Sequence, residues 1–65
     1  MSKYLKLEQM RIQKKYKHAD IAKIIGVSKS FYWQIENKKR RLTYEMAKKI
    51  AAVFNVTPDN IFLED

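Results

Sequence analysis

The side chains of this 65-residue chain that could do chemistry are mostly cations. Lys and Arg number 14 against 7 Asp and Glu, which leaves a formal net charge of +7. The densest basic run is NKKRR, at residues 37–41. Such an excess of positive charge favours a polyanionic partner, and charge alone does not distinguish nucleic acid from an anionic membrane surface.

Residues for catalysis or metal binding are missing from the sequence. It has one histidine, His18, no cysteine and no glycine-rich phosphate loop, and neither paired carboxylates nor a nucleophile beside a base can be found. A lone histidine without such neighbours is a poor metal ligand and a poor catalytic base. We therefore expect no enzyme activity, no metal and no cofactor.

The stretch HADIAKIIGVSKSFYWQIEN, residues 18–37, is predicted to form two short helices around a tight turn. The first would place Ile21, Ala22 and Ile25 on one face, and Gly26 would end it. Ser28 can cap the second helix, which would bury Tyr32 and Ile35. Two helices joined in this way form a helix-turn-helix, whose second helix can enter a DNA major groove.

The rest of the chain also predicts helices. Apolar periodicity indicates a first helix from about residue 3 to 15, with Tyr4, Leu7, Met10 and Arg11 on its inner face. Thr43 can cap a fourth helix, with Tyr44 and Phe54 among its apolar positions and Asn55 as its left-handed stop. Thr57-Pro58-Asp59 begins a last helix, from 58 to about 63. With no strand-like alternation, we predict an all-α fold and one domain over residues 1–65.

The length and hydropathy of the chain further restrict the class of protein to which it can belong. An apolar fraction of 46% suits one small globular core without disulfides. No apolar run approaches the roughly 20 residues that span a bilayer, and the N-terminus lacks the apolar core of a signal peptide. We therefore expect no membrane association and a cytoplasmic location.

Several short motifs occur together in a fixed order. They are Arg11, Ile21-Ala22, Gly26-Val27-Ser28, Ile35-Glu36-Asn37, Ile50-Ala51 and Asn55-Val56-Thr57-Pro58-Asp59. In this order and spacing the chain resembles the Cro/C1-type (XRE-like) helix-turn-helix family, from about Leu7 to Phe62. The resemblance implies a compact five-helix, lambda-repressor-like DNA-binding domain.

The same resemblance implies roles for individual residues. Arg11 and Glu36 match the family's ion pair between the first and third helices. Lys29, Ser30 and Gln34 match the base-reading positions, and these side chains can bond guanine, several bases and adenine respectively. Phosphate contacts are expected from Asn37 and from the basic residues of the following loop, Lys38, Lys39, Arg40 and Arg41.

The chain departs from the family pattern at three positions. His18 replaces a glutamine that contacts phosphate, and histidine can also donate a hydrogen bond there. Lys38 replaces a glycine, so either Asn37 or Lys38 must be left-handed, which asparagine tolerates better. Leu42 replaces a proline before the fourth helix.

Three consecutive aromatic residues, Phe31, Tyr32 and Trp33, cannot all be buried on one helix. Tyr32 matches the family's core position. The rings of Phe31 and Trp33 would pack on neighbouring helices, lie flat on the surface, serve a protein interface or touch DNA. For DNA contact we favour Trp33, which is next to Gln34.

The sequence thus predicts a regulator, in particular a repressor, that binds double-stranded DNA in a sequence-specific manner. One recognition helix reads few base pairs, so we expect a homodimer on a near-palindromic operator, joined through Phe62, Leu63 and the loop before the fourth helix. Two alternatives stay open: an antitoxin or adaptor that uses the fold to bind protein, and RNA binding or nonspecific coating of nucleic acid driven by charge.

Overall fold

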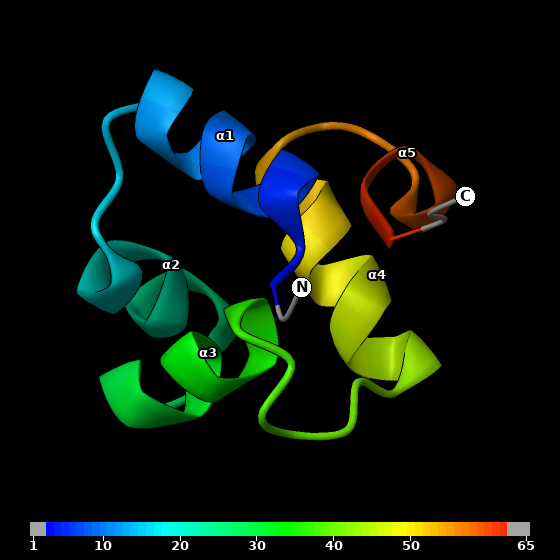
Figure 1. Ribbon diagram of the computed structural model, residues 1–65. Coiled ribbons are helices and arrows are strands. Elements are labelled where there is room, and N and C mark those ends of the chain that lie inside the picture. Colours follow the sequence, from blue (N-terminus) through cyan, green and yellow to red (C-terminus); the bar gives the residue numbers. More distant parts are fainter. Residues whose placement is uncertain (1–2, 63–65) are drawn as a thin grey trace.

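The computed structural model describes residues 3–62, which form five helices and no strand (Figure 1). They are α1 (Leu5–Gln13), α2 (His18–Ile25), α3 (Lys29–Glu36), α4 (Tyr44–Val53) and α5 (Pro58–Phe62). The prediction of an all-α fold with five helices is confirmed.

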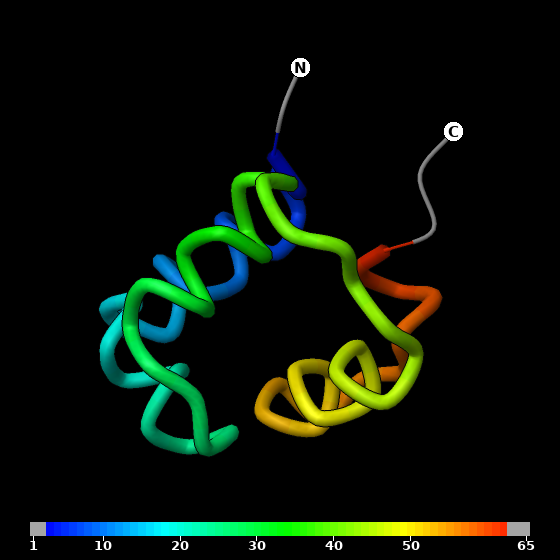
Figure 2. Tube along the Cα trace, turned by 90° about the horizontal axis from the view of Figure 1, so that it is seen from below, coloured from blue at the N-terminus to red at the C-terminus, as the bar shows by residue number. Residues whose placement is uncertain are grey.

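The helices enclose one small core. In Figure 2, α1, α2 and α3 lie on one side and α4 and α5 on the other, joined by the extended segment that follows α3. α2 packs against both α3 and α4, while α5 packs against α4 and α1. Every helix contributes a fully buried side chain to the core; among these are Leu7, Ile21, Tyr32, Ile50 and Ile61. The core therefore fixes α2 and α3 as one unit.

The predicted turn and capping residues behave as expected. Gly26 ends α2 in the left-handed region, with φ at 82°. Ser28 Oγ accepts a hydrogen bond from the Phe31 amide at 3.0 Å, and Thr43 Oγ1 accepts one from the Met46 amide at 3.2 Å. Asn55 is left-handed after α4, with φ at 58°. Each device satisfies amides or carbonyls that a helix end leaves without partners.

Three predicted helix ends were wrong by one or two residues. α1 begins at Leu5 because Tyr4 is extended, and the Tyr4 amide bonds the Glu36 carbonyl at 2.9 Å instead of a helical partner. α1 ends at Gln13, and Lys15 is left-handed. α3 ends at Glu36, one residue before the predicted end. The predicted end of the last helix, residue 63, lies outside the described residues.

Lys38, and not Asn37, takes the left-handed conformation after α3, with φ at 56°. The Asn37 amide still bonds the Trp33 carbonyl at 3.0 Å, so Asn37 continues the helical turn. Amides of residues 38 and 39 then bond the carbonyls of Ile35 and Gln34, at 3.1 and 2.7 Å. This pattern is a Schellman motif, which puts the left-handed residue at position 38 whatever its side chain.

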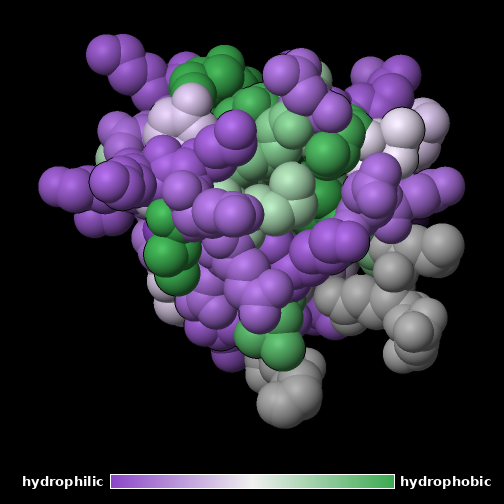
Figure 3. All heavy atoms as spheres, turned by 90° about the horizontal axis from the view of Figure 1, so that it is seen from above, coloured by the Kyte–Doolittle hydropathy of each residue, from purple (hydrophilic) through white to green (hydrophobic). Residues whose placement is uncertain are grey.

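Some large apolar side chains are exposed on the surface. Hydrophilic side chains cover most of the face drawn in Figure 3, and hydrophobic ones emerge between them. Among residues 3–62, the exposed large apolar side chains are those of Leu5, Ile12, Ile24, Trp33 and Tyr44. The exposure of Tyr44 corrects its predicted place on the apolar face of the fourth helix: it is the first residue of α4, 69% exposed, with Lys48 Nζ 5.2 Å from its ring centroid.

Candidate nucleic-acid interface

The inner face of α3 is anchored by a buried cluster of polar side chains. Arg11 donates from Nε to Glu36 Oε1 at 3.0 Å and from Nη2 to Glu36 Oε2 at 3.1 Å. The Tyr32 hydroxyl donates to the same Oε1 at 2.8 Å, and Arg11 Nη1 donates to the Tyr16 carbonyl at 3.0 Å. The structure thus brings Arg11 and Glu36 together in a bidentate pair that joins α1 to α3. Glu36 is only 1% exposed, so the pair is held away from solvent.

Burial and pairing oppose each other in the pKa values of this cluster. Burial acts to raise the pKa of Glu36, but hydrogen bonds from Arg11 and Tyr32 and the charges of Arg11 and His18 outweigh it, so the pKa is lowered. Burial acts to lower the pKa of Arg11, and its bond and charge pairing with Glu36 raise it overall. Burial, then the charge of Glu36, raises the pKa of Tyr32. Glu36 is therefore an anion, and Tyr32 a neutral donor, at neutral pH.

His18, at the start of α2, lies against this cluster. Its Nε2 is 3.4 Å from Glu36 Oε2, and its ring centroid is 5.9 Å from that of Tyr32. The side chain is about a quarter exposed. Sequence reasoning treated His18 as a phosphate contact alone and missed Glu36. No spacing along the chain could have indicated this contact, because it depends on how α2 crosses α3.

The outer face of α3 carries the predicted base-reading residues. Lys29, Ser30 and Trp33 are exposed and Gln34 is half-buried, while Tyr32 and Ile35 face the core. Gln34 Nε2 donates to Ser30 Oγ at 3.3 Å, as the spacing of four residues allows. The helix therefore presents polar groups outward at the spacing that sequence reasoning assigned to DNA contact.

The basic side chains that follow α3 do not all lie on the same side: Lys38 lies toward α1, whereas Arg40 lies against α3. Lys38 Nζ lies 4.7 Å from the ring centroid of Tyr4, next to the start of α1. Arg40 instead turns back onto α3, with its Cζ 4.3 Å from the Phe31 ring centroid and its Nε donating to Gln34 Oε1 at 3.2 Å. Lys39 and Arg41 are exposed. Sequence reasoning had given all four residues one role and missed the contact between Arg40 and Phe31.

The predicted dimer surface can be described only in part. Phe62 is half-buried, and its ring packs edge-on against Tyr4, with centroids 5.0 Å apart. Leu63 lies outside the described residues. Beside Phe62 is a shallow hollow of about 250 Å³ between α5 and the start of α4. Its lining consists of Leu42, Thr43, Tyr44, Ala47, Pro58, Asp59 and Phe62.

The fold places this protein in the helix-turn-helix class. α2 and α3 are joined by a turn that contains a glycine, and the outer face of α3 is polar. The helix-turn-helix family model matches residues 7–61, so the chain belongs to the Cro/C1-type helix-turn-helix family. Members of this family are DNA-binding regulators. The curated proteins and the solved structures gave no match. Within residues 3–62, no helix has the length and apolar character needed to cross a membrane.

Proposed function

We propose that this protein represses transcription in the cytoplasm by binding a specific DNA operator with α3 in the major groove. One observation carries the proposal. The outer face of α3, with Lys29, Ser30, Trp33 and Gln34, continues directly into the basic segment 37–41. This order places groups that can bond base edges on the helix and groups that can neutralise phosphates at its end.

The base-reading chemistry is proposed for four residues. Lys29 can bond guanine O6 and N7, Gln34 can pair with adenine, and Ser30 can serve several bases. Trp33, 43% exposed, offers an apolar face to a thymine methyl group or to the sugar-phosphate backbone. All four project from two turns of one helix, which suits a short run of base pairs.

Phosphate contacts are proposed on both sides of α3. His18 begins α2, where its partly exposed ring can donate a hydrogen bond to one strand. Asn37, Lys39 and Arg41 follow α3, where the groove wall would lie. Lys38 can take part if its head group leaves the Tyr4 ring. These contacts contribute affinity and position, without reading sequence.

We propose that two copies bind a near-palindromic site, each with its α3 in one of two major grooves about 34 Å apart. The half-buried Phe62 and the apolar lining of the hollow between α5 and the start of α4 support an interface there, because a two-fold interface uses the same patch of both subunits and would bury this apolar surface. The sequence also assigned Leu63 to this interface, and that residue lies outside the described part of the chain. Bound over a promoter, such a dimer would exclude the transcription machinery.

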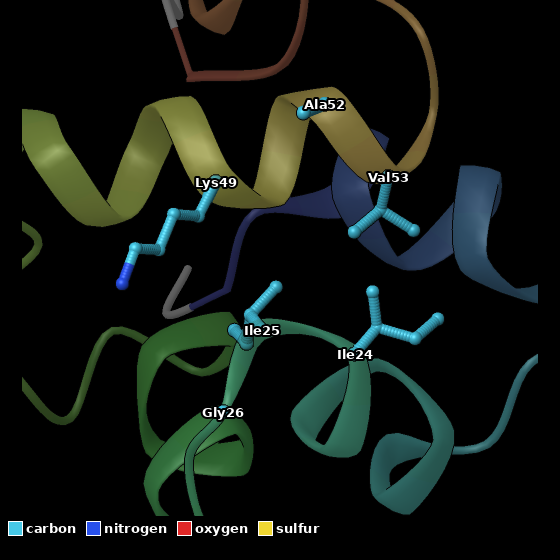
Figure 4. Close-up of a pocket in the computed structure, with 6 residues that line it drawn as sticks. All are labelled: Ile24, Ile25, Gly26, Lys49, Ala52 and Val53. Carbon is cyan, nitrogen blue, oxygen red and sulfur yellow. The ribbon is translucent and has the colours of Figure 1, made fainter.

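A second candidate function is protein binding by an antitoxin or adaptor. An apolar hollow of about 480 Å³ lies between α2 and α4 and favours it (Figure 4). In that view Ile24, Ile25 and Val53 project into the hollow, and Lys49 runs along its edge. Ile24 is 55% exposed, so an apolar partner group could bury it.

Selection of bound duplexes from a random pool tests the proposed function. We expect enrichment of one near-palindromic sequence, bound at least about 10³-fold more tightly than a scrambled duplex. Sedimentation of the complex should give two chains per duplex. A pool that stays random after repeated rounds would contradict sequence-specific binding and favour nonspecific coating or the protein-binding function.

A further inference from the structure

The guanidinium of Arg40 lies on the outer face of α3 and not beyond its end. Its Cζ is 4.3 Å from the Phe31 ring centroid, and Nε donates to Gln34 Oε1 at 3.2 Å. Phe31 and Gln34 are three residues apart, so they are neighbours on the helix surface. The loop thus returns Arg40 to the middle of the helix, next to a proposed base-reading residue.

The ring of Phe31 restrains the position of the Arg40 guanidinium. Its ring is half-buried and packs against the core, so the surface under the guanidinium is fixed. A guanidinium over an aromatic face is attracted by the ring and loses part of its rotational freedom. The hydrogen bond to Gln34 adds a second restraint. Within residues 3–62, no hydrogen bond involves either Nη group of Arg40, and both remain available as donors.

The same contact fixes the amide of Gln34. Its Oε1 accepts from Arg40, and its Nε2 donates to Ser30 Oγ at 3.3 Å. The reverse orientation would put an NH2 group against the guanidinium and lose the Arg40 bond. Ser30, Gln34 and Arg40 therefore form a hydrogen-bonded chain across the outer face of α3, with the donor groups of Arg40 at one end.

We infer that Arg40 is a specificity residue, whose Nη groups donate to O6 and N7 of one guanine in each half-site, beside the base that Gln34 reads. This inference rests on the proposed function. The planar fork of arginine matches the two acceptors of guanine, and a surface on which the fork already lies reduces the cost of ordering it. The inference separates Arg40 from Lys39 and Arg41, which are assigned to phosphates.

The test compares two charge-conserving variants, Arg40→Lys and Arg41→Lys, by selection from a random duplex pool and by titration on the parent's preferred site. Lysine keeps the charge, so a phosphate contact would largely survive either change. At position 40, however, lysine has no planar group to lie on the Phe31 ring, and it can approach guanine only as a flexible point charge that is not held beside Gln34. Both side chains are exposed. Circular dichroism and melting curves should match the parent and will show that the fold is kept.

We expect Arg40→Lys to lose the preference for one G·C pair in each half-site. Its affinity for the parent's site should fall by a factor of about ten to a hundred, with its affinity for a scrambled duplex unchanged. Arg41→Lys should select the parent's site. Phe31→Leu, which removes the ring under the guanidinium, should relax the same base pair as Arg40→Lys.

Two results would overturn the inference, and only the second of them would also reject the proposed function. If the parent selects a site, and Arg40→Lys and Arg40→Ala both select the same site with the same base preferences, Arg40 contacts phosphate only and the proposed function stands. If the parent selects no site at all, the inference fails together with the proposed function.

Discussion

Two clusters of hydrogen-bonded polar side chains lie on opposite faces of α3. One is buried in the protein, and the other lies next to solvent. On the inner face, Glu36 receives bonds from Arg11 and Tyr32 at 2.8–3.1 Å with almost no solvent exposure. On the outer face, Gln34 bonds Ser30 and Arg40 at 3.2–3.3 Å next to solvent. Bonds of the inner cluster cannot be exchanged for water, whereas those of the outer cluster can.

This difference separates stability from recognition within one eight-residue helix. The inner cluster fixes the position of α3 against α1, because a buried charge without its partner is costly. The outer cluster contributes little to stability, because its bonds lie next to solvent, and its side chains face the surface at which DNA binding is proposed. Changes to the inner face should therefore alter folding, and changes to the outer face should alter binding.

The largest expected effect is the loss of the buried pair. Glu36→Gln leaves Arg11 buried without its counter-charge and should lower the free energy of unfolding by about 3 kcal/mol or more, measured by urea or thermal unfolding. The matched control is Glu45→Gln, which removes an exposed carboxylate 3.8 Å from Lys48 Nζ. That variant should melt with the parent. If the melting curves of Glu36→Gln and the parent superimpose, the inner cluster contributes no more to stability than the outer cluster does.

Acid should weaken the same cluster in the parent protein. The pKa of Glu36 is lowered in the folded state, because the bonds from Arg11 and Tyr32 outweigh burial. Its contribution to stability is therefore complete above the unfolded value near 4.5 and is lost as the pH falls through the lower folded value. When unfolding is measured between pH 7 and pH 2, the urea concentration at the midpoint should decrease as the pH drops below about 4.5. In Glu36→Gln this part of the acid loss should be absent.

An effect of about 1–3 kcal/mol is expected on DNA binding for Gln34→Ala, with no comparable loss of stability. The variant should relax the preference at one base pair of each half-site and bind a scrambled duplex as the parent does. Trp33, the single tryptophan, is next in sequence to Gln34, so its fluorescence should follow the titration. Equal weakening on both duplexes would assign Gln34 to a nonspecific role.

The smallest effect is expected at Arg41. Arg41→Ala should weaken binding to all duplexes alike and reduce the slope of log affinity against log salt by about one for a lost phosphate contact. Titrations on the operator and on a scrambled duplex at several salt concentrations measure this slope. A changed base preference in this variant would move Arg41 from the phosphate set to the base-reading set.

Signals within a few residues predicted much of the fold. The periodicity around Ile21 and Tyr32, the caps at Ser28 and Thr43, and the glycine stop at residue 26 predicted α2, α3 and the start of α4. These signals act through bonds between near neighbours, so a sequence displays them directly. The pairing of Arg11 with Glu36 followed from the family resemblance.

Contacts made by the segment after α3 could not be predicted in this way. Lys38 is left-handed because the Schellman motif ends α3 there, and Arg40 reaches Phe31 because of the path that follows. His18 meets Glu36 only through the crossing of α2 and α3. These contacts depend on where separate elements come to rest, which no local pattern specifies.

The proposal that α3 lies in the DNA major groove is tested most directly by a cross-link from the outer face of this helix. The chain has no cysteine, so Ser30→Cys carries a unique thiol, and duplexes can carry a thiol tether on the major-groove edge of one base at a time. We predict disulfide formation at one position in each half-site, and none from the control Gln9→Cys on the exposed side of α1. Equal cross-linking by both variants, or none from Ser30→Cys at any position, would contradict the placement of α3 in the major groove.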